Sequence, residues 1–275
     1  MIESKKISLY KNNNKIFIKK SFNQKFSSYL DFKREVNAYK LLKKFEFTPN
    51  LKKVDQNSKF ILLERIPGQH PENLNHLTPF ILEIFNSFYS LKLPSKKDKI
   101  YAKERYINIL SFENNIKKRY IETTEINDNQ LMKLLKLAKD NFLDFKNKNL
   151  ESFEKITRIR MYCHSDISRK NIIIYKNKNY LIDFEYFGID NPLKMIADLF
   201  LHPENKLRKR FEQTILKHLA YMFNIHEDKL FYDYFLIKQI YKLKWAFIIA
   251  KQFSKFDISY DYRKRLLNKI EKYAS

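Results

Sequence analysis

Three polar residues lie at spacings that suit the transfer of a phosphoryl group, and they are Asp166, Asn171 and Asp183. The first two lie in the run HSDISRKN, and Asp183 lies in the run LIDFE, twelve residues after Asn171. Phosphoryl transfer needs one carboxylate that orients the acceptor hydroxyl and takes its proton. It also needs an amide oxygen and a second carboxylate that hold Mg²⁺ against the phosphates. We therefore expect Asp166 to be the base, and Asn171 and Asp183 to be the Mg²⁺ ligands.

The β-favouring runs beside this motif explain how its members would meet. Asn171–Tyr175 and Tyr180–Phe184 flank the polar stretch Lys176–Asn179, which is the pattern of a hairpin. Such a hairpin places Asn171 and Asp183 side by side. The alternative is an ordinary polar loop whose acids are satisfied by neighbours, but the apolar residues after Asn171 and around Asp183 favour the catalytic interpretation.

The N-terminal part predicts a small β-rich lobe. Strand patterns cover Lys6–Tyr10, Lys15–Lys20 and Phe60–Leu63. Between them, Ser27–Phe45 has apolar residues at spacings of three and four, which predicts a helix. Gly68 is one of only two glycines in the chain and follows Pro67, so we expect this lobe to end there.

Beyond Gly68 the pattern is mainly helical. We expect an α+β fold with two lobes, a nucleotide-binding N-terminal lobe over residues 1–68 and a catalytic, acceptor-binding C-terminal lobe over residues 69–275. The expected helices cover 78–91, 104–120 and 129–145, and others follow from residue 207 onward.

Composition excludes some classes of protein. The chain has 275 residues, of which 44% are hydrophobic and 31% charged, which is ordinary for a globular protein. Its longest apolar run near the C-terminus is too short to cross a bilayer, and no signal-peptide pattern opens the chain. A lone cysteine, Cys163, agrees with a reducing compartment. We expect a soluble cytoplasmic protein with no transmembrane segment, and its oligomeric state stays open.

The net charge of +23 has two interpretations. One is a partner with phosphates, such as nucleic acid, and the other is a preference for lysine along the whole chain. Lysines occur in almost every segment, and no isolated basic tail or arginine-rich block is present. We therefore expect no specific nucleic-acid partner, although the positive field would help to recruit an anionic substrate.

Two runs of residues identify a family resemblance. The run from His164 to Asp198 resembles the catalytic region of the aminoglycoside phosphotransferase and choline kinase superfamily, and IDFEY at 182–186 resembles its choline-kinase-type metal motif. FILLERIPG at 60–68 resembles the lobe-connecting strand and hinge of that family. The resemblance extends from about Lys15 to Lys251. It implies a two-lobed protein-kinase-like fold and the use of ATP or GTP with Mg²⁺ on a hydroxyl of a small acceptor, such as a sugar, an amino alcohol or an aminoglycoside.

The resemblance also assigns residues to the nucleotide. Lys19 would reach the phosphates and Glu35 would pair with it from the helix, while Glu64 and Ile66 would contact the nucleotide at the hinge. Lys20 is a rival for the role of Lys19, because strand alternation directs only one of the two side chains into the cleft.

Further residues would support the site. His164 would brace the catalytic loop, and Arg169 and Glu185 would contact the phosphate or the acceptor. Asp198 resembles a second bracing aspartate of the family. It lies fifteen residues after Asp183, however, where many members have about twelve, and Met195 occupies the usual place.

One departure from the family keeps an alternative open. No glycine-rich loop precedes Lys19, and Asn12-Asn13-Asn14 lies where backbone amides would cover the phosphates. This departure favours a pseudokinase, or a nucleotide-binding module without turnover. Retention of Asp166, Asn171 and Asp183 together favours an active small-molecule kinase.

Overall fold

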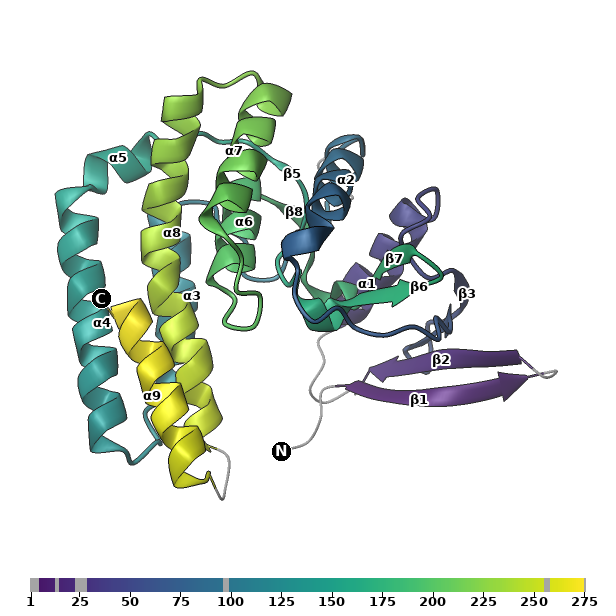
Figure 1. Ribbon diagram of the computed structural model, residues 1–275, viewed down its shortest axis with the longest axis horizontal. Coiled ribbons are helices and arrows are strands. Elements are labelled where there is room, and N and C mark those ends of the chain that lie inside the picture. The colour runs from purple at the N-terminus through teal and green to yellow at the C-terminus, as the bar shows by residue number, and fades with distance from the viewer. Residues whose placement is uncertain (1–4, 13–14, 23–28, 96–98, 255–257, 275) are drawn as a thin grey trace. The chain divides into compact units, whose positions relative to one another are not determined.

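The computed structural model describes the chain except for residues 1–4, 13–14, 23–28, 96–98, 255–257 and 275. It forms two compact units (Figure 1), of which unit 1 contains residues 1–103 and 160–190 and unit 2 contains residues 104–159 and 191–275. Strands lie in unit 1 and long helices in unit 2, so the expected α+β class is confirmed. The units do not divide at Gly68, and the lobe boundary expected there stays a prediction.

An antiparallel sheet forms one part of unit 1. It consists of β1 (Lys5–Asn12), β2 (Lys15–Phe22), β4 (Phe60–Glu64) and β3 (Leu51–Asp55), in the order β1-β2-β4-β3. The three strands expected from the sequence are present. The fourth, β3, was not expected, because its sequence LKKVD has two exposed lysines and no clear alternation of apolar and polar residues.

Helix α1 (Tyr29–Leu42) buries the apolar face that its periodicity predicts, including Phe32, Val36 and Tyr39. The described helix ends three residues before the expected end at Phe45, because the Phe45 amide turns back to bond the Leu42 carbonyl. Its first expected residues, 27 and 28, lie outside the described residues.

The expected catalytic hairpin is present but turns earlier than predicted. Strand β6 (Ile172–Tyr175) pairs with β7 (Lys178–Leu181), and Lys176 and Asn177 alone form the turn with φ of 47° and 60°. Two successive residues in the left-handed region are typical of a two-residue hairpin loop, because this conformation matches the twist of the strands. The sequence analysis did not expect this two-residue turn. The expectations of a four-residue turn and of a strand over Tyr180–Phe184 are therefore wrong, and Asp183 lies beyond the strand.

A second strand pair of unit 1 was not expected. Strand β5 (Met161–His164) runs antiparallel to β8 (Phe187–Asp190), and every residue of both strands is buried. Gly188 in β8 has φ of 156°, and a Cβ atom there would lie 2.3 Å from the Ala102 nitrogen. The close approach of the segment at Ala102 therefore requires glycine at this position.

Aromatic rings connect the elements of unit 1. Phe88 in α2 (Thr78–Tyr89) contacts Phe187, which contacts Phe184, which contacts Tyr39 of α1, with centroid separations of 5.4, 5.8 and 5.0 Å. All three contacts have edge-to-face geometry, which aromatic pairs prefer. Short 3-10 turns complete the unit, at η1 (Asn75–Leu77), η3 (Arg169–Asn171) and η4 (Phe184–Tyr186).

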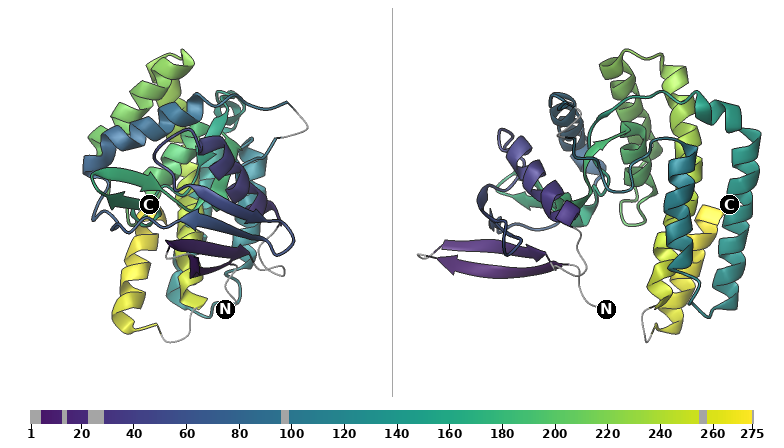
Figure 2. Two further views of the ribbon diagram at one scale, coloured as in Figure 1. Left: turned by 90° about the vertical axis from the view of Figure 1, so that its right-hand side faces the viewer. Right: turned by 180° about the vertical axis from the view of Figure 1, so that it is seen from behind.

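Unit 2 is helical, and its central helix α8 is buried on most sides. Helices α3, α4, α6, α7 and α9 all pack against α8, and Figure 2 shows the long helices side by side. The helix expected from residue 104 begins only at Ile109, because Asn108 and Ser111 form a capping box there. Within the described residues, no helix combines the length and apolar character that crossing a membrane requires. The elements are α3 (Ile109–Ile121), α4 (Asn129–Lys148), α5 (Leu150–Glu154), α6 (Pro192–Leu201), α7 (Lys209–Phe223), α8 (Glu227–Ala250), η5 (Lys251–Ser254) and α9 (Tyr260–Ala274).

The need for glycine at position 188 can be tested by substitution, with a substitution at Asn177, a second residue with positive φ, as the control. Gly188→Ala should lower the free energy of unfolding by at least about 2 kcal/mol, because a side chain there is strained and meets the backbone of Tyr101 and Ala102. Asn177→Gly should change it by only about 0.5 kcal/mol, because glycine suits a left-handed turn. Urea denaturation measures both, and equal effects of the two substitutions would contradict this account.

Candidate active site

A buried ion cluster joins three elements of unit 1. Lys20 of β2 is 4% exposed, and its Nζ donates hydrogen bonds to Glu35 Oε1 of α1 and to Asp183 Oδ1, the latter at 2.7 Å. Glu35 is fully buried, whereas the Asp183 side chain is 24% exposed. One ammonium group therefore fixes both carboxylates, and Asp183 is the member of the cluster that a ligand can reach.

The electrostatics of the cluster favour the charged form of Lys20. Burial alone would lower the pKa of Lys20, but the carboxylates of Glu35 and Asp183 outweigh burial and raise its pKa above the ordinary value. Lys20 therefore carries its positive charge at every physiological pH. Two carboxylates and one ammonium leave the cluster with a net negative charge, which suits a cation beside Asp183.

The expected pairing of Glu35 with Lys19 is wrong. Lys19 lies on the other face of β2, where its Nζ is 4.3 Å from the centroid of the Phe60 ring. Successive side chains of a strand point to opposite faces, so only one of the two lysines can reach α1. The structure selects Lys20, the alternative that the sequence left open.

The loop after β5 brings Asp166 and Asn171 together. Asn171 Nδ2 donates to the Asp166 backbone carbonyl and to Asp166 Oδ2, both at 2.8 Å. Turn η3 brings Asn171 back toward Asp166, because the Asn171 amide bonds the Ser168 carbonyl at 2.9 Å. The Asn171 carbonyl accepts from the Ile182 amide at 2.9 Å, so Asn171 also lies beside the chain that leads to Asp183.

His164 links the two halves of the motif. Its Nδ1 accepts a hydrogen bond from the Asp166 amide at 3.2 Å, so its Nε2 carries the proton and donates to the Ile182 carbonyl at 3.4 Å. The ring is fully buried and lies 5.1 Å from the Phe184 ring. His164 thus connects the loop of Asp166 to the segment of Asp183, as a bracing residue would.

Asp183 adopts an unusual backbone conformation. Its φ and ψ are 64° and 68°, in the left-handed region that few residues other than glycine and asparagine enter readily. Tyr39, one turn after Glu35 on α1, packs edge-to-face on Phe184 and takes a hydrogen bond from the Asp183 backbone. Burial, followed by the Glu35 and Asp183 carboxylates, raises the pKa of Tyr39 well above its usual value. The sequence assigned Tyr39 only to the apolar face of the helix, and its spacing of four from Glu35 was the available signal.

The donor set fits a magnesium ion. Because Asn171 Nδ2 is committed to Asp166, the side-chain oxygen of Asn171 is the group left for a cation. Asp183 supplies a partly exposed carboxylate. No group of three or more histidine, cysteine or acidic side chains that could hold a metal occurs within the described residues. Mg²⁺ is commonly held by one or two carboxylates, with phosphate and water oxygens completing its shell, so this sparse set suits it.

Glu64 and Ile66, the residues expected to contact a nucleotide, lie at the end of β4 and just beyond it. Glu64 ends β4, and its Oε2 accepts a hydrogen bond from Asn50 Nδ2 at 2.6 Å. Ile66 lies two residues later and is partly exposed.

Asn13 and Asn14 of the expected phosphate-covering turn lie outside the described residues. Asn12 pairs with Lys15, and Lys20 lies five positions after Lys15 along β2, a span of roughly 17 Å at about 3.4 Å per residue. That end of the hairpin is therefore distant from Lys20. Contacts of Glu64 and Ile66 with a nucleotide stay predictions.

Two further expected site residues lie in short turns next to the expected metal ligands. Arg169 opens η3, which ends at Asn171, and Glu185 is the middle residue of η4, directly after Asp183. Their contacts with a phosphate or an acceptor stay predictions.

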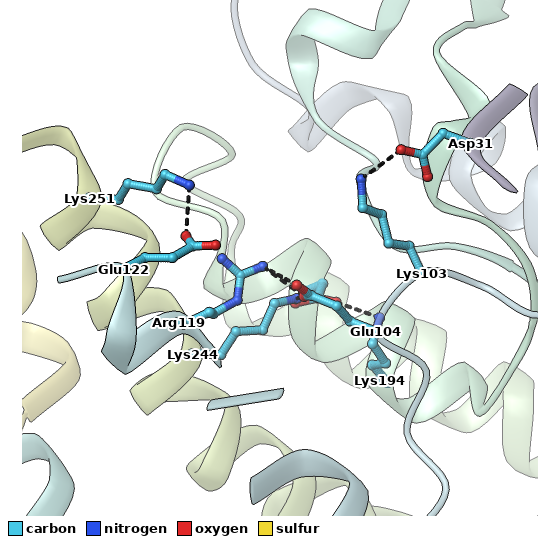
Figure 3. Close-up of polar contacts among 9 residues, drawn as sticks. Asp31, Lys103, Glu104, Arg119, Glu122, Lys194, Lys244 and Lys251 are labelled. Atoms are coloured by element: carbon cyan, nitrogen blue, oxygen red, sulfur yellow. Dashed lines mark hydrogen bonds and ion pairs between the residues drawn. The ribbon is translucent and has the colours of Figure 1, made fainter. Parts of the chain in front are cut away.

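Asp198 belongs to a buried charge cluster of unit 2, and Figure 3 labels Lys194, Lys244, Glu104 and Arg119 of this cluster. The two carboxylate oxygens of Asp198 accept from Lys194 at 3.1 Å and from Lys244 at 2.7 Å, and nearby Glu104 accepts two bonds from Arg119. Burial alone would raise the pKa of Asp198, but Lys244 and Lys194 outweigh it and hold the pKa below its usual value. The sequence missed both lysines, although Lys194 lies four residues before Asp198. The bracing role of Asp198 stays a prediction. Figure 3 also shows the Lys103–Asp31 ion pair of unit 1.

No protein family model matches the chain, and no curated protein matches it. Solved structures do match over nearly the whole chain. The choline kinase LicA from Streptococcus pneumoniae is 18% identical with a TM-score of 0.65, over 98% of this chain and 89% of that one. An ethanolamine kinase from Plasmodium vivax is 12% identical with a TM-score of 0.63, over 99% and 82%. A thermostable mutant of the aminoglycoside phosphotransferase APH(4)-Ia is 12% identical with a TM-score of 0.62, over 99% and 91%. These likenesses confirm the expected kinase-like fold.

The assignment of Lys20 can be tested by stability. Lys20→Met should lower the free energy of unfolding by about 3 kcal/mol or more, because it leaves Glu35 buried without its ammonium partner. Lys19→Met should cost no more than about 1 kcal/mol, because Lys19 is partly exposed and loses only a cation–π contact with Phe60. Urea denaturation at neutral pH measures both variants, and a larger loss in Lys19→Met would contradict the assignment.

Proposed function

We propose that this protein is a Mg²⁺-dependent small-molecule kinase, which transfers the γ-phosphate of ATP or GTP to a hydroxyl group of a small acceptor. The observation that carries the proposal is the continuous set of contacts from Lys20 and Glu35, through Asp183 and the Ile182 carbonyl, to His164 and the Asp166–Asn171 pair. These contacts support the proposal because they connect the residues that would serve as the fixed cation, the proton acceptor and the two oxygen ligands.

The nucleotide would take its contacts from three elements. Lys20 is the cation for its phosphates, Glu35 keeps the Lys20 ammonium in place, and Glu64 and Ile66 lie on the segment that would contact its base. The similar LicA has been solved with AMP, and the similar APH(4)-Ia mutant with AMP-PNP and hygromycin B. Both complexes support a nucleotide cosubstrate for this fold.

The proposed metal ligands would help to neutralise the charge of the phosphates, and Asp166 would accept the proton of the acceptor hydroxyl. Asp183 and Asn171 would hold Mg²⁺, which would supply positive charge against the phosphates of the nucleotide. Asp166 orients the acceptor hydroxyl and takes its proton as that oxygen bonds to the γ-phosphorus. The bond from phosphorus to the β–γ bridging oxygen breaks, and the nucleoside diphosphate leaves. Arg169, three residues after Asp166, would contact the transferred group.

The proposed acceptor class rests more on the similar solved structures than on the geometry of the site. By their names, the similar proteins act on choline, on ethanolamine and on aminoglycosides. We propose an amino alcohol, a sugar or an aminoglycoside as acceptor, with Glu185, two residues after Asp183, as a carboxylate that would contact it. A cytoplasmic location, expected from the sequence, agrees with the use of a nucleoside triphosphate.

Turnover of an acceptor panel tests the proposal. The panel is choline, ethanolamine, hygromycin B and a hexose, each with ATP or GTP and Mg²⁺. For an active acceptor, Asp166→Asn should lower kcat by about 10²–10⁴, the usual contribution of general-base catalysis, because an amide cannot take the hydroxyl proton. Nucleotide binding should persist in this variant, since Asp166 is not one of the proposed nucleotide contacts.

A matched control is Asp140→Asn, an exposed position on α4, which should retain kcat. Retention of kcat by Asp166→Asn would remove the proposed base. Mg²⁺-dependent nucleotide binding without turnover of any acceptor would favour the pseudokinase alternative.

A further inference from the structure

Helices α3, α4 and α8 of unit 2 enclose a hollow of about 240 Å³ that the phosphotransferase site does not use. Its floor consists of Ile116, Phe142, Leu243 and Phe247, which are at most 8% exposed. These side chains come from three different helices, which Figure 1 shows side by side. The hollow is therefore a feature of the packed unit and is present without any ligand.

Apolar surface continues from the floor to the mouth of the hollow. Tyr120 of α3 and Leu143 of α4 line it, and they are 37% and 36% exposed. The Tyr120 ring packs edge-to-face on Phe247 at 6.0 Å. A ligand that covered these two side chains would remove apolar surface from water, which favours binding.

Positively charged groups outnumber negatively charged groups at the mouth of the hollow. Glu113 is the acidic group there, and Lys146 already pairs with it at 2.8 Å. Lys117 and Lys139 are exposed, and neither forms an ion pair with a carboxylate in the described part of the chain. Lys139 instead lies over the Tyr120 ring, with Nζ 5.0 Å from its centroid. The mouth therefore offers two cations directly above an apolar floor.

We propose that this hollow binds a small amphiphilic anion, a molecule with one carboxylate or phosphate group on an apolar chain or ring. Its apolar part would fill the hollow, and its anionic group would lie between Lys117 and Lys139. A volume of 240 Å³ corresponds to about eight groups of the size of a water molecule, at roughly 30 Å³ each. An eight-carbon acid therefore matches the hollow in both size and charge.

The size of the hollow argues against a larger occupant. Pockets for drug-sized ligands have about 300–1,000 Å³, and a docked helix needs anchors along several turns of a groove. Here a single hollow takes one apolar group. The proposal is independent of phosphoryl transfer, so it can fail while the proposed function holds, and the reverse is also true.

Three probes of equal length test the charge preference. Sodium octanoate, 1-octanol and octylammonium chloride are titrated into the full-length protein by calorimetry, below their aggregation concentrations. Octanoate should bind at one site and at least about fivefold more tightly than octanol, since rim ion pairs contribute up to about 1 kcal/mol each. Octylammonium should bind more weakly than octanol, because the mouth is cationic.

Matched charge variants locate the site. Lys117→Glu with Lys139→Glu should weaken octanoate binding at least about tenfold and make octylammonium the preferred probe. The control is Lys118→Glu with Lys136→Glu, which changes the net charge equally at exposed positions of the same helices outside the hollow. It should alter octanoate affinity by less than about threefold. Leu143→Trp fills the hollow from a partly exposed position and should abolish saturable binding while the protein stays folded.

Four results would overturn the proposal. They are the absence of saturable octanoate binding, equal affinity for octanoate and octylammonium, equal loss in the two double variants, and unchanged binding in Leu143→Trp. Binding of a peptide with an acidic residue beside leucine, without binding of octanoate, would also overturn it in favour of a protein partner.

Discussion

Burial of the Lys20 ammonium between Glu35 and Asp183 is the constraint on which unit 1 depends. Three segments meet at this one group, although they lie up to 163 residues apart in the chain. Loss of one partner of a buried ion pair leaves an uncompensated charge, which costs several kcal/mol. Strand β2, helix α1 and the segment after β7 must therefore hold their relative positions together. Asp183 is the carboxylate of this cluster that is partly exposed to solvent.

Aromatic packing keeps this constraint effective. The ring of Phe184 lies between Tyr39 and His164, with centroid separations of 5.0 and 5.1 Å, and all three side chains are buried. They exclude water from one side of the cluster, and charges interact more strongly where the local dielectric is low. They also hold the segment in which Asp183 has its left-handed backbone. Packing, backbone conformation and electrostatics thus converge on the orientation of a single carboxylate.

Local patterns predicted much of this arrangement, and long-range contacts explain the rest. Residue types and spacing were enough to predict the hairpin that separates Asn171 from Asp183, although not its turn length, because that information lies within twenty residues. The roles of Asp166, Asn171 and Asp183 stay predictions. The choice between Lys19 and Lys20 depends on which face of β2 meets α1, and no local pattern encodes that. Strands β5 and β8 have four residues each and pair across more than twenty others, so their alternation is too short to read. The lysines around Asp198 looked like ordinary surface charges, because burial is a tertiary property.

Mg²⁺ dependence of AMP-PNP affinity in Asp183→Asn, compared with the unchanged protein, tests the central claim most directly. Calorimetric titration with and without Mg²⁺ gives both affinities for each protein. The account predicts that Mg²⁺ tightens AMP-PNP binding to the unchanged protein at least about tenfold, equivalent to about 1.4 kcal/mol, and that this gain disappears in Asp183→Asn. An equal gain from Mg²⁺ in both proteins would show that Asp183 does not hold the metal, and would contradict the account.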